Sequence, residues 1–164
     1  MNRSAKLLIV GGLGLAIIGM IYGLWYALFD EHQTLEQMGG SLANGFAQAA
    51  ERNMSGAHVA LEQFGAIAGE YVREVHAHSH WITLGLVLIA LGMSYERVTL
   101  PEKLRVLLAF GLLLGSALFP LGVLLQTWPV GMVGKLLSVT GSALVIISFA
   151  GITLGLIKSG DAKE

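Results

Sequence analysis

The chain has 164 residues, of which 54% are hydrophobic and only 13% are charged. Roughly a quarter of the residues in an ordinary soluble domain are charged, so this composition excludes that class and favours a protein of the lipid bilayer. The formal net charge of −1 gives no electrostatic basis for binding nucleic acid. The absence of cysteine excludes disulfides, thiolate metal sites, iron–sulfur clusters and haem attached through a CxxCH motif.

The first membrane span is expected at residues 6–29. An unbroken stretch of apolar residues and glycine, from Leu7 to Phe29, follows Arg3 and Lys6. It is longer than the ~7–15-residue core of a secretory signal peptide, and no cleavage motif of small residues follows it closely. We therefore interpret this segment as a retained helix.

A more polar segment, residues 30–75, follows the first span. Within residues 57–75 the apolar side chains recur at helical spacing, while charged residues such as Glu62 and Arg73 occupy the other face. The earlier part, which contains Gly45, has a weaker pattern. We expect one or two amphipathic helices here, resting on the outer membrane surface or on the membrane helices.

Three further spans are expected at residues 75–95, 105–127 and 131–157, which are almost free of charge. The predicted fold class is therefore all-α: an integral membrane four-helix bundle, with amphipathic extracytoplasmic helices between its first and second spans. Residues 1–164 would form a single membrane domain in contact with the lipid bilayer.

The basic residues predict the orientation, because the cytoplasmic loops of membrane proteins are enriched in Lys and Arg. If the N-terminus is cytoplasmic, only Arg52, Arg73 and Lys135 fall on the outer side. The basic residues on the cytoplasmic side are then Arg3, Lys6, Arg97, Lys103, Arg105, Lys158 and Lys163. A multi-pass protein with both termini in the cytoplasm is expected.

Paired glycines in three of the spans predict close helix contacts. Two glycines four residues apart lie on one helix face and let a neighbouring backbone approach closely. This pattern favours packing within the bundle, and it also suits self-association or contact with other membrane subunits. The pairs are Gly19 and Gly23, Gly111 and Gly115, and Gly151 and Gly155.

The segment from Trp81 to Tyr95 is too short to cross the membrane by itself. The residues from Trp81 to Tyr95 make about 22 Å of helix at ~1.5 Å per residue, whereas the hydrocarbon core is ~30 Å thick. The helix must therefore begin earlier and bring His76, His78 and His80 to the lipid boundary. Ionisable residues at such a position indicate a functional site, because their burial costs free energy unless they are paired or liganded.

The spacing of these histidines predicts how they are arranged. His76 and His80 are four residues apart and share a helix face, where they could bind one metal ion together, and a neutral imidazole is also the usual ligand of haem, Zn or Cu. His78 faces roughly the opposite way, near Glu74, and a carboxylate or carbonyl could fix its tautomer. Two interpretations remain beside a cofactor site: hydrogen bonding to lipid headgroups, water or loops, and a quinone or proton-transfer role.

The residues Arg73-Glu-Val-His76-Ala-His78, followed by Leu84-Gly85, resemble the start of the second helix of subunit I in the haem–copper oxidase superfamily. The resemblance is greatest to the cbb3-type oxidases, the nitric oxide reductases and small unclassified relatives. It covers this short segment and, in topology alone, the four expected helices. It implies that His76 is a low-spin haem ligand and Arg73 the arginine before it, with His78 where many members have asparagine.

The chain also departs from that family. No histidine follows His80, and the family's remaining haem and copper ligands lie on later helices. A second axial ligand would have to come from His80, His58, His32, a partner or a second copy. We therefore do not expect a complete oxidase.

The leading hypothesis is a small subunit of the bacterial inner (cytoplasmic) membrane that binds haem b or a Cu or Zn ion. Its ligands would be His76, His78 and His80 beside Arg73, and it would act in or beside a respiratory electron-transfer complex. The alternative is a cofactor-free structural or assembly subunit of a larger membrane complex. The sequence has no Ser–His–acid set, P-loop or HExxH motif that would indicate an independent enzyme.

Overall fold

The computed structural model describes residues 2–161, and within them the chain is all-α. The elements are α1 (Arg3–Phe29), α2 (Glu31–Ala50), α3 (Met54–Ser94), a short 3-10 helix (Tyr95–Arg97), α4 (Glu102–Leu125) and α5 (Gly131–Asp161). Four of them, α1, α3, α4 and α5, are long and apolar enough to cross a membrane. The four predicted spans are thus confirmed as apolar helices.

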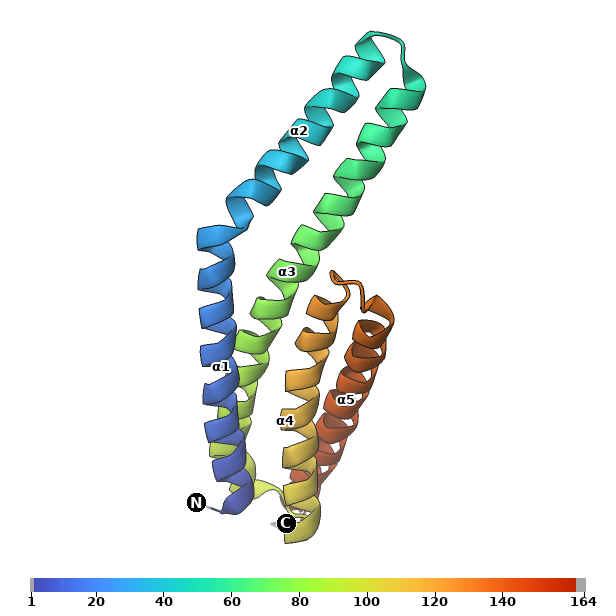
Figure 1. Ribbon diagram of the computed structural model, residues 1–164. Helices are drawn as coiled ribbons and strands as arrows, with labels where there is room; N and C mark the ends of the chain where they lie inside the picture. The colour runs from blue at the N-terminus through green and yellow to red at the C-terminus, as the bar shows by residue number, and fades with distance from the viewer. Residues whose placement is uncertain (1, 162–164) are drawn as a thin grey trace.

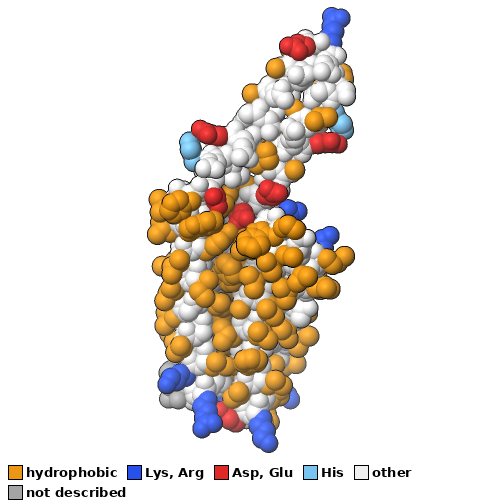
Figure 2. Space-filling view, in the orientation of Figure 1, with side chains coloured by type: hydrophobic (Ala, Val, Ile, Leu, Met, Phe, Trp, Pro, Cys, Tyr) orange, Lys and Arg blue, Asp and Glu red, His pale blue; other side chains and the backbone are white. Residues whose placement is uncertain are grey.

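The four long helices pack side by side over the lower part of Figure 1, with α1 against the second half of α3 and α4 against α5. Both ends of the chain and the α3–α4 connection lie at the same end of this bundle (Figure 1). Lys and Arg side chains gather there, while hydrophobic side chains cover the flank of the four helices (Figure 2). Of the basic residues predicted for this side, Lys163 lies outside the described residues.

The glycine pairs serve packing within the chain. A Cβ atom on Gly19 would lie 3.0 Å from the carbonyl oxygen of His78, and one on Gly115 would lie 2.7 Å from that of Gly141. The closest approach is between α4 and α5, where a Cβ on Gly122 would lie 2.3 Å from the backbone nitrogen of Ser138. Backbones in lipid approach this closely only where a side chain is missing.

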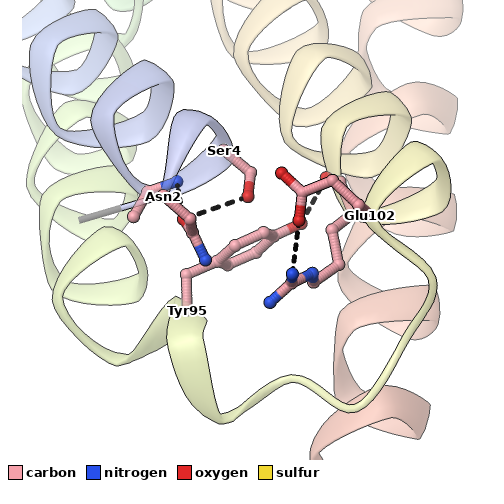
Figure 3. A network of polar contacts seen from close by, with 6 residues as sticks. Asn2, Ser4, Tyr95 and Glu102 are labelled. Atoms are coloured by element: carbon pink, nitrogen blue, oxygen red, sulfur yellow. Dashed lines mark hydrogen bonds and ion pairs between the residues drawn. The ribbon is translucent and has the colours of Figure 1, made fainter.

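A polar network closes the basic end of the bundle (Figure 3). The buried Tyr95 hydroxyl donates to the carbonyl oxygen of Arg105 at 2.8 Å, and the Arg105 side chain pairs with Glu102. The Asn2 side chain caps α1 by accepting a hydrogen bond from the amide of Ala5 at 2.8 Å. The first set of contacts links the end of α3 to the start of α4, and the second satisfies a backbone amide in the first turn of α1.

The polar segment after α1 does not rest on the bundle. Instead α2 pairs with the first half of α3, and this helical hairpin projects beyond the ends of α4 and α5 (Figure 1). The prediction of one or two helices in this segment is confirmed. The two helical pieces pack on each other and not on α4 or α5, and their placement relative to the membrane surface stays a prediction. The hairpin projects because α3 continues without a break from Met54 to Ser94, so its first half follows the direction of its membrane half.

The hairpin is held by a close helix contact and a tight turn. A Cβ on Gly45 would lie 3.6 Å from the buried Ala60 side chain, so α2 approaches α3 closely. At the turn the amide of Asn53 donates to the carbonyl of Gln48 at 2.8 Å, around Arg52 in the left-handed region (φ 61°). This is the hydrogen-bond pattern that ends many helices, and the Asn53 side chain then caps α3.

The α4–α5 contact gives a test of the bundle. Gly122→Ala should destabilise the protein by about 1–3 kcal/mol, because the new methyl group meets backbone that cannot move aside. Gly14→Ala is the matched control, since a Cβ at Gly14 has no atom within 4 Å. Thermal unfolding followed by circular dichroism in detergent measures both, and an unchanged midpoint for Gly122→Ala would contradict this packing.

Candidate functional site

The predicted site residues all belong to α3 and lie on different faces of it, at the level where the hairpin meets the bundle. The His78 ring lies against Gly23 of α1, and its Nδ1 is 3.2 Å from the backbone carbonyl oxygen of Glu74. Because a carbonyl oxygen only accepts, Nδ1 is the donor in this contact. The prediction that His78 lies near Glu74 therefore agrees with the structure, with the backbone rather than the carboxylate as the partner.

His76 and His80 lie on a different face of α3 from His78. Their ring centroids are 6.0 Å apart, and the His80 ring lies 4.9 Å from the ring of Phe119 on α4. His80 is half-buried by this contact, while His76 is exposed. The i, i+4 spacing thus brings the two rings together as predicted.

Arg73 precedes His76 by three residues and His80 by seven, so it belongs to the same side of α3. Its side chain lines a shallow cavity of about 230 Å³ at the turn between α4 and α5, together with Gln126, Gly131, Met132 and Lys135. Two basic side chains therefore line this cavity. This side of α3 is positive.

The described residues do not by themselves complete a metal site. Within residues 2–161 no group of three or more His, Asp or Glu side chains is placed to hold one ion. His32 lies at the base of the hairpin and His58 near its tip. Both are exposed, and each pairs with a carboxylate one turn ahead, at 3.2 Å from Glu36 and Glu62. The chain offers His76 and His80 as a pair, and further ligands would have to come from another molecule.

Glu74 occupies a structural junction that the sequence analysis missed. The Tyr22 hydroxyl of α1 donates to one oxygen of its carboxylate. The Thr127 hydroxyl lies 3.4 Å from the other oxygen and also contacts the Leu124 carbonyl at 2.8 Å. Glu74 therefore links α3 to α1 and to the end of α4. The one signal in the sequence was Tyr22 itself, a hydroxyl in an otherwise apolar stretch that needs a partner when buried.

Comparison with known proteins adds no family. No family model matches the chain, and neither the curated proteins nor the solved structures give a significant match. The resemblance to the haem–copper oxidase superfamily therefore stays a prediction from a few residues, and the function has to be argued from geometry.

The Tyr22–Glu74 contact predicts the effect of a single hydroxyl. Tyr22→Phe should lower the free energy of unfolding by about 1.5–3 kcal/mol, the usual worth of a hydrogen bond to a charged group. Tyr26→Phe is the matched control one turn away, because the Tyr26 hydroxyl lies near Thr34 but makes no hydrogen bond of normal length and angle among residues 2–161. Denaturant unfolding in mild detergent compares the two variants, and equal losses would argue against Glu74 as a junction.

Proposed function

We propose that this chain is a structural or assembly subunit of a larger membrane complex and that its α2–α3 hairpin is the arm that docks another subunit. The observation that supports this most is the projection of the hairpin beyond α4 and α5 (Figure 1). None of the residues of α2 is fully buried, so this helix adds little to the core of the chain itself. A helix of 20 residues with no buried side chain is typical of a surface that contacts a partner.

The proposed orientation places the arm outside the cytoplasm. The basic end of the bundle carries the termini and would face the cytoplasm of a bacterial inner membrane, as the positive-inside rule requires. Exposed Trp25 and Trp128 lie near the base of the hairpin and suit the outer lipid–water interface. With twenty residues in α2, the arm extends about 30 Å from that interface.

The surface of the arm suits a partner with an apolar contact and a basic rim. An apolar groove of about 210 Å³ runs between α2 and α3 near the tip of the hairpin. Phe46 stands beside it with 69% of its surface exposed, and Leu61 lines the other side. Residues 31–74 contain six acidic and two basic residues, so the hairpin as a whole is negatively charged.

Phe46→Asp should release the chain from its native complex, because it places a charge at the apolar centre of the contact. Native electrophoresis of gently solubilised membranes should show the wild-type chain in an assembly with at least one other protein. The variant should migrate as the free chain. Raising the salt concentration should weaken the wild-type assembly, since part of the attraction is electrostatic.

Gln63→Asp is the control, because it adds the same charge at an exposed position of α3 outside the groove. It should leave the assembly intact. A wild-type chain that migrates alone or only with copies of itself would contradict the proposed function.

We propose a haem or metal role as the second candidate, supported by the pair formed by His76 and His80. Their rings share one face of α3 beside Arg73, where the resemblance to the oxidase subunits also implies a haem ligand. One of these two imidazoles would supply an axial ligand to haem b, or both would bind one Cu or Zn ion, and a neighbouring subunit would complete the coordination. Such a group would lie near the outer face, in or beside an electron-transfer complex.

This second candidate has a spectroscopic test. The complex purified from native membranes should show a b-type reduced-minus-oxidised spectrum, or one Cu or Zn ion per chain, and His76→Ala should lose it. His32→Ala on the exposed hairpin is the control and should keep it. A complex that contains the chain but has neither haem bands nor stoichiometric metal rules the candidate out.

A further inference from the structure

A shallow cavity lies where α3 passes the turn between α4 and α5. Arg73 from α3 and Lys135 from α5 line it, together with Gln126 and the first two residues of α5, Gly131 and Met132. Its volume is about 230 Å³, whereas one water molecule needs ~10–15 Å³. The cavity therefore has room for a group larger than water.

The two basic residues are unusual for this end of the bundle. Lys and Arg side chains gather mainly at the opposite end, beside the chain termini (Figure 2). Arg52, Arg73 and Lys135 are the basic residues expected on the outer side, and two of these three line one cavity. Because they are far apart in the chain, the packing of α4 and its partner α5 beside α3 is what brings them together.

Neither basic side chain has an acidic partner within the described part of the chain. The ion pairs among residues 2–161 belong to His32, His58 and Arg105 instead. Of the described residues that line the cavity, none is acidic. Two cations that face one cavity repel each other, and an anion between them would remove this repulsion. The cavity is therefore suited to an anion.

The chemistry of the pair favours a phosphate group. The planar guanidinium group of arginine binds two phosphate oxygens at once, and the lysine ammonium group binds phosphate as a point charge. The exposed Trp128 lies in the same turn between α4 and α5 and suits the lipid–water interface, which is the level of lipid phosphates. We propose that Arg73 and Lys135 bind one phosphate group in this cavity, supplied by a phospholipid headgroup or by free phosphate.

The surface of α5 next to the cavity favours the phospholipid. Met132 lines the cavity, and Leu136 and Val139 follow it at helical spacing on the same face of α5. All three side chains are exposed, so they form an apolar stripe that leads from the cavity into the membrane-spanning part of α5. An acyl chain attached to the bound phosphate would lie along this stripe. The site is separate from the docking groove and needs no partner subunit.

The test uses the full chain in maltoside detergent, which contains no phosphate. A ligand that binds the folded protein raises its thermal midpoint, so added phosphatidylglycerol should raise it. Diacylglycerol with the same acyl chains lacks the phosphate and should leave the midpoint unchanged. Arg73→Gln and Lys135→Gln should each weaken the binding of phosphatidylglycerol about tenfold, the loss that follows from one hydrogen bond to a charged group. The double variant should not respond.

Lys158→Gln is the matched control, because it removes the same charge from the other end of α5. It should respond to phosphatidylglycerol as the wild type does. Arg73, Lys135 and Lys158 are all exposed, so the variants should fold, and circular dichroism without ligand checks this. An equal loss in Lys158→Gln, or an equal response of the wild type to diacylglycerol, would overturn the proposal.

Inorganic phosphate separates the two sources of the group. If phosphatidylglycerol raises the midpoint and inorganic phosphate does not, the ligand is a lipid headgroup. If inorganic phosphate raises it at the lower concentration and the double variant loses this rise, the ligand is free phosphate. No response to either probe would overturn the proposal and favour an acidic segment of a partner protein in the cavity. None of these results depends on whether the hairpin docks another subunit.

Discussion

The continuity of α3 is the constraint on which the rest of the structure depends. Backbone groups in lipid must be satisfied within a helix, and α3 keeps this hydrogen-bond ladder without interruption from Met54 to Ser94. One half of it packs against α1 in the apolar part, and the other half carries α2. A break near Val75 would separate the hairpin from the bundle, whereas the continuous helix gives the hairpin a fixed direction.

The same helix separates opposite charges at the level of its membrane boundary. Toward α1 and α2 it presents Glu70 and Glu74, which line a polar pocket together with Asp30. Toward α4 and α5 it presents Arg73, near Lys135. Because side chains a few positions apart point in different directions from one helix, a short stretch of sequence serves both faces. The acidic side faces α1 and α2, and the basic side carries the histidine pair.

Much of the local structure could be predicted from the sequence, because hydrophobic length and spacing act within one helix. The four apolar helices follow from stretches long enough to span a bilayer. The length of the hydrocarbon core predicted that the helix of the second span begins before His76, and α3 begins at Met54. The shared face of His76 and His80 follows from their spacing alone.

The tertiary structure decided which segment packs against each helix face. The sequence by itself determined an all-α chain with four apolar helices and histidines near one boundary. Only the fold placed α2 on α3 as a projecting hairpin and joined Tyr22 to Glu74. The physical reason is that periodicity assigns residues to a face of their own helix, while the neighbour of that face depends on packing between segments far apart in the chain.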